Sequence, residues 1–347
     1  MKKDRKNMGI DMVFSRCPVG TATELIIKKG WLQAVLETHD AQFRLLQSMA
    51  PVYHRAHYTQ EEPLHVRDGG NIPPLWAQSQ GDRSVLLGVS YQKELRGVFV
   101  RTDSEIRHID DLRGKRLAIP IRPEAVVDFR YLTMLHGFEG VLAHVGISLE
   151  EVELTRIRCH NIIPQAVTGL DTLKRDSDFM TEDFQAVLEG RADAAFANSI
   201  KAVRHNRAGI FRNILSVVEN KEIPNINNNS VLAITCTKLF AYAHPELVVA
   251  YLRELIKGGR WIKEHRNEFL ECTASGVYGA SAEEMGAAFE NETLFQRVPE
   301  LTEQGFAMLD RQKEFMLRWN MIPREKDFEV SAWADGSFLR EAFSTIE

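Results

Sequence analysis

The sequence predicts an α/β protein, because short apolar or alternating segments alternate with longer helical patterns along most of its 347 residues. The expected strands are Ile10–Phe14, Gln42–Gln47, Ser84–Val89, Gly97–Val100, Arg116–Ile119, Ala192–Ala197 and Val231–Thr235. The expected helices between them are Thr21–Val35, Ile72–Gln78, Pro123–Gly137, Thr181–Glu189, Pro245–Arg266, Ser281–Glu290 and Glu303–Trp319. This order favours mainly parallel sheets that are covered by helices on both faces.

Composition and charge exclude several classes of protein. Hydrophobic residues make up 44% of the chain and charged residues 26%, which are ordinary values for a globular protein. The net charge of −5 gives no electrostatic reason to expect a nucleic-acid partner. No apolar run approaches the ~20 residues of a membrane-spanning helix. No apolar signal-peptide segment follows the basic cluster near the start of the chain, so we expect a cytoplasmic protein without a membrane partner.

Cys17 lies where the first expected strand gives way to the first expected helix. That helix opens with Thr21-Ala22-Thr23-Glu24, a pattern typical of a capping box with Thr21 as N-cap and Glu24 as its reciprocal partner. A thiol just ahead of a helix N-terminus is expected to have a lowered pKa, which favours the thiolate. The position therefore predicts a chemically active cysteine.

The other three cysteines carry no such pattern. Cys159, Cys236 and Cys272 are widely separated, which argues against a disulfide framework or a structural zinc site. Cys236 lies in an apolar strand, and Cys159 neighbours His160 on an extended segment, where adjacent side chains point to opposite faces. We interpret all three as packing residues.

Arg67 opens the phrase Arg67-Asp68-Gly69-Gly70-Asn71. An arginine fork beside glycine amides, where backbone can approach a ligand closely, makes a suitable cradle for a small oxyanion. Tyr58 could add an aromatic wall, although core packing is the more common role of such a ring.

His57 shares its segment with His54 and His65, so a metal site is an alternative interpretation. Metal-binding histidines are commonly backed by carboxylates, and Glu61 and Glu62 lie nearby. We favour His57 as an imidazole partner of Cys17 instead, because an unassisted thiol is only a few per cent ionised near neutral pH. We expect neither a metal nor a cofactor.

Two further phrases resemble type II periplasmic binding proteins, which are two-lobed with a central cleft. They run from Ile109 to Ile119 and from Phe184 to Ala195. The resemblance implies a first lobe of residues 1–105 and 229–347 and a second lobe of residues 106–228. Chain crossings are then expected near Thr102–Ile106 and near Asn228–Val231, with the ligand in the cleft at the strand ends.

The N-terminal third of the sequence resembles a more specific family. Phe14-Ser15-x-Cys17-Pro18-Val19, the spacing of His57 and Arg67, and Arg67-x-Gly69-Gly70-x-Ile72-Pro73-Pro74-Leu75 resemble the aromatic sulfinate desulfinases of dibenzothiophene desulfurisation. These are cofactor-free enzymes with the periplasmic-binding-protein fold that release sulfite from a hydroxybiphenyl sulfinate. The resemblance implies that Cys17, His57 and Arg67 are catalytic. It also implies that Ser15, Arg67, Gly69, Gly70 and Tyr58 contact the substrate.

The chain departs from that family in two respects. The segment between Cys17 and His57 is longer, and residues 120–198, where much of the family's aryl pocket lies, are difficult to align. The expected chemistry is cleavage of the carbon–sulfur bond of an organic sulfinate by a monomeric enzyme. Cys17 would either protonate the ring carbon or attack the sulfur, and the sequence leaves both open.

Two other functions compete with this one. The first is a solute-binding protein that captures a sulfonate or similar anion for a transporter, which would need no activated thiol. The second is the fungal-type pyrimidine synthase branch of the same fold, which makes a thiamine precursor. That branch carries a clustered cysteine motif, and the four scattered cysteines here do not provide one.

Overall fold

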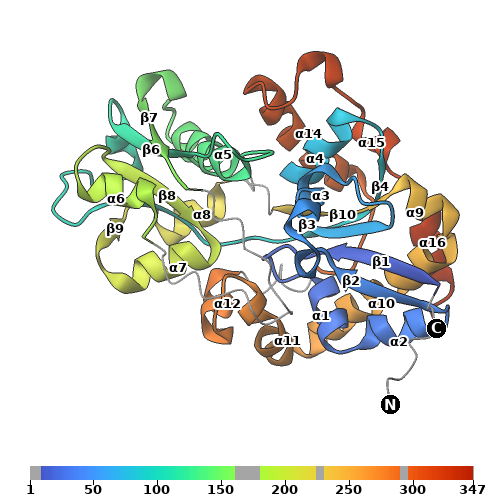
Figure 1. Ribbon diagram of the computed structural model, residues 1–347. Coiled ribbons are helices and arrows are strands. Elements are labelled where there is room, and N and C mark those ends of the chain that lie inside the picture. Colours follow the sequence, from blue (N-terminus) through green and yellow to red (C-terminus); the bar gives the residue numbers. More distant parts are fainter. Residues whose placement is uncertain (1–8, 161–179, 224–229, 290–295, 347) are drawn as a thin grey trace.

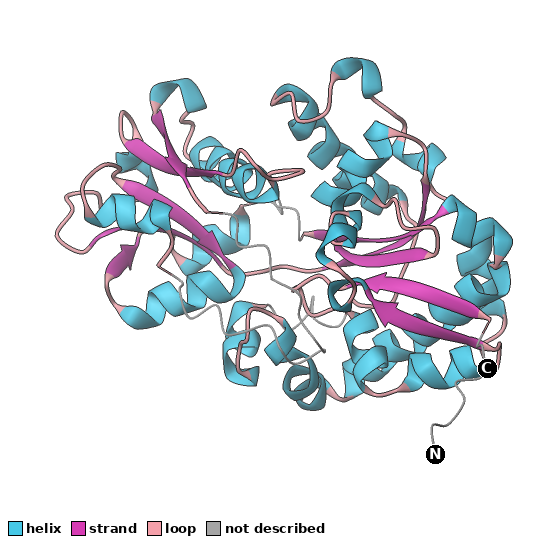
Figure 2. Ribbon diagram, in the orientation of Figure 1, coloured by secondary structure: helices cyan, strands magenta, loops and turns pink. Residues whose placement is uncertain are grey.

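A computed structural model describes residues 9–160, 180–223, 230–289 and 296–346. The chain forms two lobes, each built around a five-stranded sheet (Figure 1). Helices flank both sheets, as the colouring by secondary structure makes plain in Figure 2. The predicted α/β class is confirmed, and the sheets are mixed.

The first sheet has the strand order β2-β1-β3-β10-β4. Its strands are β1 (Ile10–Ser15), β2 (Ala41–Leu45), β3 (His65–Gly70), β4 (Ser84–Tyr91) and β10 (Val231–Thr237). β1 pairs in parallel with both β2 and β3, whereas β10 runs antiparallel to β3 and β4. The expectation of mainly parallel sheets is met in strand direction, because four of the five strands of this sheet run the same way and only the returning strand β10 runs opposite to them.

The second sheet repeats this plan with the order β7-β6-β8-β5-β9. Its strands are β5 (Arg96–Arg101), β6 (Arg116–Ile121), β7 (Glu153–Arg158), β8 (Ala194–Asn198) and β9 (Phe211–Asn213). β6 is parallel to β7 and β8, and β5 is antiparallel to β8 and β9.

The first crossing between lobes lies earlier than the sequence predicted. β5 pairs only within the second sheet, so the chain leaves the first lobe between the end of β4 and the start of β5, at residues 92–95. The expected crossing near Thr102–Ile106, and with it the boundary at 105/106, was wrong. An apolar strand fits either sheet, so its composition does not reveal which one it joins. The expected crossing near Asn228–Val231 falls partly outside the described residues.

Helices of the first lobe cover both faces of its sheet. One face packs against α1, α2 and α10, and α4 and α14 lie on the other side. The bounds are α1 (Ala22–Lys28), α2 (Trp31–Glu37), α3 (Ala56–Thr59), α4 (Ile72–Gln80), α9 (Lys238–Ala243), α10 (Pro245–Glu264), α11 (Arg266–Thr273), α12 (Ala282–Ala288), α14 (Glu303–Arg318), α15 (Val330–Trp333) and α16 (Ser337–Ser344). The predicted helix Thr21–Val35 is split into α1 and α2, because Gly30 adopts a left-handed φ of 74° between them.

The second lobe has α5 on one face of its sheet and α6 and α7 on the other. These helices are α5 (Phe129–His144), α6 (Glu182–Leu188), α7 (Ser199–Ala208) and α8 (Val217–Glu222). Short 3-10 helices occur at Leu46–Ser48, Pro51–Tyr53, Ile109–Leu112, Leu149–Glu151, Ala274–Gly276 and Arg324–Lys326.

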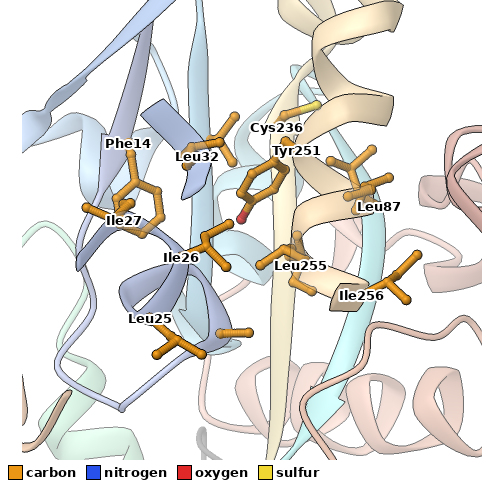
Figure 3. Close-up of a cluster of buried hydrophobic side chains, with 14 of the residues drawn as sticks. Phe14, Leu25, Ile26, Ile27, Leu32, Leu87, Cys236, Tyr251, Leu255 and Ile256 are labelled. Atoms are coloured by element: carbon orange, nitrogen blue, oxygen red, sulfur yellow. The ribbon is translucent and has the colours of Figure 1, made fainter. Parts of the chain in front are cut away.

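The core of the first lobe is apolar but contains one phenol. Figure 3 shows Tyr251 of α10 among Phe14, Ile26, Leu255 and Cys236. All five side chains are at most 1% exposed. Cys236 is thus a packing residue, as predicted, and burying such side chains stabilises the fold by roughly 1.5–3 kcal/mol each.

C-terminal helices tie the two lobes together on two sides. Arg204 of α7 pairs with Glu284 of α12, their closest atoms lying 3.0 Å apart. On the other side, the ring of His136 on α5 stacks on Phe315 of α14 with centroids 4.0 Å apart, and Arg318 pairs with Glu139 at 2.7 Å. The C-terminal segment therefore contacts both lobes and does not simply return to the first.

Three strands were absent from the sequence prediction. β3 was missed because its sequence, His-Val-Arg-Asp-Gly-Gly, is polar and glycine-rich, and such residues are depleted in strands. All six of its residues are buried, because β3 lies between β1 and β10. The other two are β7 and the three-residue β9. Within the described residues, no helix combines the length and apolar character that a membrane crossing requires.

The packing of α10 gives a stability test. A Cβ on Gly259 would lie 2.6 Å from Val298 N and 2.8 Å from Arg297 C, which are backbone atoms that cannot rotate away. We expect Gly259→Ala to lower the free energy of unfolding by about 1–3 kcal/mol, measured by urea denaturation.

A matched control is Gly286→Ala on α12. There the nearest atoms, Arg266 Nη2 and Leu270 Cδ1, lie 3.4 and 3.5 Å away. This variant should be neutral or gain about 0.5–1 kcal/mol from helix propensity. Equal losses in both variants would contradict the packing that the structure describes.

Candidate active site

The candidate site lies where β1 and β3 end. The two strands are parallel, so their carboxyl ends meet at one edge of the sheet, and Ser15 is in register with Arg67. On the other side of β3, the antiparallel strand β10 places Thr235 opposite Arg67, so Ser15, Arg67 and Thr235 form a row across the sheet. Side chains two residues apart share a face of a strand, so Cys17 and Gly69 follow this row on the same face.

Cys17 and Gly69 touch closely. A Cβ on Gly69 would lie 2.4 Å from Cys17 Cβ and 2.6 Å from its Sγ, so only glycine fits at this position. The Arg67 Nη2 lies 3.9 Å from Sγ, and the backbone N–H of Gly70 donates to the sulfur. The structure thus brings together four residues that the sequence predicted as a group.

The backbone beside Cys17 is held by a pair of hydrogen bonds from the Gln47 side chain. The Gln47 side chain accepts from Arg16 N at 3.1 Å and donates to Arg16 O at 3.0 Å. The Arg16 guanidinium in turn pairs with Glu24 of α1 at 2.9 Å, and both side chains are almost fully buried. The chain therefore presents Ser15 and Cys17 from a fixed backbone.

Arg67 is a buried charge that has no carboxylate partner in the described parts of the chain. Its side chain is 1% exposed, Nη1 donates to Gly70 O at 2.7 Å, and Nε has no hydrogen-bond partner. Among the described residues, the ion pairs do not include Arg67. An uncompensated buried charge costs several kcal/mol, so the site favours an anionic ligand that would compensate it.

Other buried polar atoms around Arg67 also lack partners. They are Ser15 Oγ, His57 Nδ1, Gln60 Oε1 and His65 Nε2. Gln60 caps the C-terminus of α3 in a left-handed conformation with φ 52°, and its Nε2 donates to Thr235 Oγ1 at 2.8 Å. Buried polar groups are normally satisfied, so a cluster of exceptions beside a cation indicates a binding site.

The prediction of a lowered pKa for Cys17 was wrong. Burial raises the pKa of this thiol, and the opposing effects of Arg67 and of the Gly70 N–H do not outweigh it; the charge of Asp68 raises it further. The predicted capping box is only half formed. Thr21 accepts from Glu24 N at 3.2 Å, but the Glu24 carboxylate pairs with Arg16 and Lys28.

His57 lies close to the site on α3. Burial lowers the pKa of His57 well below its usual value, and Arg67 and His65 lower it further, so its imidazole is neutral. Among the described residues, no hydrogen bond joins His57 to Cys17, whose sulfur contacts Arg67 and Gly70. The pairing of His57 with Cys17 therefore stays a prediction.

The second lobe reaches the site through an aromatic contact. Tyr58 packs against the edge of His57, with ring centroids 4.9 Å apart, and stacks on Phe129 of α5 at 6.4 Å. The Arg122 guanidinium lies 4.5 Å from the Phe129 centroid and pairs with Asp128 at 2.9 Å. Tyr58 is thus placed between His57 of the first lobe and Phe129 of the second.

The three histidines do not gather into a metal site. His54 bonds to Met49 O at 3.0 Å, whereas His65 lies on β3 in register with Val13. Within the described parts of the chain, no three His, Cys, Asp or Glu side chains come together as metal ligands.

Sequence reasoning missed Gln60, Thr235 and Phe129. Thr235 was the last residue of an expected core strand, and nothing local shows that it pairs with Arg67 across the sheet. The left-handed backbone at Gln60 also has no local signal, since glycine and asparagine usually occupy that conformation. Only the tertiary arrangement brings these residues to the site.

Comparisons with known proteins extend this picture. A family model described as NMT1/THI5 like matches residues 74–174. The 2'-hydroxybiphenyl-2-sulfinate desulfinase of Rhodococcus erythropolis is 23% identical over 357 residues, covering 96% of this chain and 93% of that protein. The crystal structure of a cysteine-to-serine mutant of DSZB in complex with biphenyl-2-sulfinic acid aligns with a TM-score of 0.73 at 21% identity, covering 97% of this chain and 99% of that one.

A periplasmic sulfonate-binding protein, SsuA of Methylobacillus flagellatus, aligns with a TM-score of 0.66 at 14% identity and covers 96% of this chain and 94% of its own. These likenesses confirm the two-lobed fold of type II periplasmic binding proteins. The resemblance to the sulfinate desulfinases is also confirmed, at distant identity and along nearly the whole chain. The family model begins after Cys17, His57 and Arg67, so it does not bear on them.

The close approach at Gly69 gives a direct test. We expect Gly69→Ala to displace the turn that carries Cys17, because the added Cβ would overlap Cys17 Cβ. The variant should lose about 1–3 kcal/mol of stability, and its Cys17 should be alkylated by iodoacetamide at a changed rate. Gly81→Ala is the control, since its nearest neighbour is a flexible Arg83 atom at 3.6 Å. Unchanged alkylation in both variants would contradict the contact.

Acid sensitivity follows from His65. Burial, with a further effect of Arg67, lowers the pKa of His65 to about 3, whereas an unfolded histidine titrates near ~6.5. Below pH ~6.5 the unfolded chain binds a proton at this residue that the native protein does not bind. The free energy of unfolding therefore decreases by about 1.4 kcal/mol for each unit by which the pH is lowered. Urea titrations from pH 7 to 4 should show a shallower loss for His65→Gln, and an identical slope would refute this.

Proposed function

We propose that this protein is an enzyme that cleaves the carbon–sulfur bond of an aromatic or related organic sulfinate and releases sulfite. The observation that carries the proposal is Arg67, a buried guanidinium that has no carboxylate partner among the described residues and lies 3.9 Å from the thiol of Cys17. An anion held by that guanidinium would be in reach of the sulfur. The name of the curated relatives, a sulfinate desulfinase, supports the choice of anion.

In this proposal the sulfinate oxygens replace the missing partners at the site. Arg67 Nε and the Ser15 hydroxyl, both buried and without partners, would donate to the two oxygens. Gly69 and Gly70 would line the anion from the backbone side. Tyr58, stacked on Phe129 between the lobes, would lie against the organic group.

Cys17 would act as the proton donor. The raised pKa of Cys17 keeps the sulfur protonated, which suits an acid better than a nucleophile. The thiol proton would pass to the ring carbon that bears the sulfinate, and the carbon–sulfur bond would break with its electron pair returned to the ring. Sulfur dioxide would leave and react with water to give bisulfite and a proton, and that proton would restore the thiol.

His57 and Arg67 would assist this step. The thiolate that forms after proton transfer would be stabilised by the positive charge of Arg67. The neutral imidazole of His57, with Nδ1 buried and without a partner, is able to accept a hydrogen bond and to relay the proton that restores the thiol.

The second candidate function is a binding protein for an organic sulfonate. The similarity to sulfonate-binding proteins favours it, with TM-scores of 0.66 and 0.64 for two of them. A binding protein needs a cation and hydrogen-bond donors, which this site has, but it needs no thiol against the cation. The pyrimidine synthase interpretation has less support, because the chain's cysteines are not clustered. We also propose that the enzyme works as a monomer in the cytoplasm, as the sequence predicts.

A sulfite-release assay against a panel of aryl sulfinates tests the proposal. The native protein should release equal amounts of sulfite and arene, both of which can be measured. We expect Cys17→Ser to lose at least about 10²-fold in rate, because a hydroxyl is a much weaker acid than a thiol. Arg67→Ala should weaken binding and rate together, by about 2–5 kcal/mol. His57→Gln should cause an intermediate loss of rate.

Cys272→Ser is the matched control. Cys272 is half-buried on α11, distant in sequence from the site strands, and should retain full activity after substitution. Full turnover by Cys17→Ser would exclude the acid role. Tight binding of a sulfonate without any sulfite from the sulfinates would instead favour the binding protein.

A further inference from the structure

Asp68 lies directly behind the site, in a part of β3 that the proposed reaction does not use. Arg67 and Gly69 contact Cys17 from one face of the strand, so Asp68 between them points to the opposite face. Its side chain is 2% exposed. A carboxyl group buried next to Gly69, the glycine that touches the thiol, has to be held by specific partners.

Those partners come from the helix that follows Cys17. The hydroxyl of Thr23, in the first turn of α1, donates to Asp68 Oδ2 at 2.8 Å. The Thr23 oxygen is also 2.6 Å from the Tyr251 hydroxyl of α10. Since the Thr23 hydroxyl donates to Asp68, the Tyr251 hydroxyl must donate to Thr23. The buried hydrogen bonds therefore run from Tyr251 through Thr23 to the carboxylate of Asp68. Figure 3 shows the Tyr251 hydroxyl pointing away from α10, inside the core.

The hydrogen bonds between Tyr251, Thr23 and Asp68 fix the position of Cys17 from the opposite face of β3. The turn at residues 16–21 joins the end of β1 to the start of α1, and Cys17 lies within it. Asp68 bonds the start of α1 to the strand whose Arg67 and Gly69 face the thiol. The turn is therefore bonded to β3 where it enters α1, whereas the two hydrogen bonds of Gln47 hold it where it leaves β1.

Asp68 also supplies a negative charge. Burial is the largest effect and raises the pKa of Asp68, while hydrogen bonds from Thr23 and Thr21 and the positive charge of Arg297 offset part of that rise and favour the carboxylate.

We propose that Asp68 is a positioning residue that holds the Cys17 turn against Arg67 and Gly69 and places a carboxyl group behind the thiol. This rests on the proposed desulfination, in which Cys17 is the acid, but the state of the thiol can be measured without any substrate.

The groups around the thiol define what such a measurement reports. Arg67 lowers the pKa of Cys17 and Asp68 raises it, both from β3, and Tyr58 faces the thiol from α3. His57 and His65 face Arg67 and are neutral. Asp68 itself faces Arg297 and the Tyr251 phenol, whose pKa burial raises well above its usual value. Asp68 is thus the negative charge whose removal should act on the thiol.

The test is the pH dependence of Cys17 alkylation by iodoacetamide, followed on its own peptide by mass spectrometry. Asp68→Asn keeps the size and an oxygen that accepts from Thr23 but removes the charge. We expect the midpoint of the alkylation profile to move down by about one pH unit, because a negative neighbour no longer disfavours the thiolate. Below both midpoints, alkylation should then be about tenfold faster.

Tyr251→Phe is the matched control. It removes the hydroxyl at the far end of the hydrogen bonds that lead to Asp68 but leaves the carboxyl group of Asp68 in place. The midpoint of the alkylation profile should therefore stay where it is in the native protein. A second variant, Thr23→Val, removes the bond between α1 and Asp68. It should slow sulfite release without lowering the midpoint, and Thr23→Ser should restore the rate.

The outcomes separate the two proposals. An unchanged or higher midpoint in folded Asp68→Asn overturns the role of Asp68, whatever the activity of the protein. Should Asp68→Asn fail to fold, a Thr23→Val variant with the native rate of sulfite release overturns it instead. If no sulfinate yields sulfite but the midpoint moves down, the desulfinase proposal fails and Asp68 still sets the state of the thiol.

Discussion

Arg67 carries a positive charge into the interior of the first lobe, and the surrounding structure is arranged to accommodate it. The residue lies on β3, between β1 and β10, and its side chain is 1% exposed. No carboxylate pairs with it among the described residues, and its bonds go to Gly70 O and toward Cys17. Desolvation of a buried charge costs several kcal/mol, so the fold has to hold Arg67 in place, and an anionic ligand would offset that cost.

Parallel pairing of β1 with β3 explains why these residues meet. The register that sets Ser15 opposite Arg67 also brings Cys17 alongside Gly69, and only a glycine leaves room for the thiol. The two ends of the Cys17 turn are fixed separately, by Gln47 near β1 and by Asp68 near α1. A thiol held this firmly is suited to delivering a proton along one direction, since proton transfer depends on geometry before it depends on acidity.

Alternating periodicity predicted the fold class, and the resemblance to the sulfinate desulfinases grouped Cys17 with Arg67, Gly69 and Gly70. The sequence did not predict β3 as a strand, since a polar, glycine-rich segment becomes a strand only when two neighbours pair with it. It also gave the wrong sign for the pKa of Cys17. The position ahead of a helix is visible in the sequence, but the burial of the thiol and the carboxylate behind it are tertiary facts. Gln60 was invisible for the same reason.

The sign of that pKa shift bears on how one fold serves two functions. A thiolate beside Arg67 would form an internal ion pair and would occupy the guanidinium that an anionic ligand needs. A neutral thiol leaves the charge of Arg67 available for the ligand and keeps a proton in place for it. Burial and the nearby Asp68 both favour the neutral form, against the pull of Arg67 and the Gly70 N–H. In the proposed reaction the site would therefore bind an anion and protonate it, because the thiol does not neutralise the cation beside it.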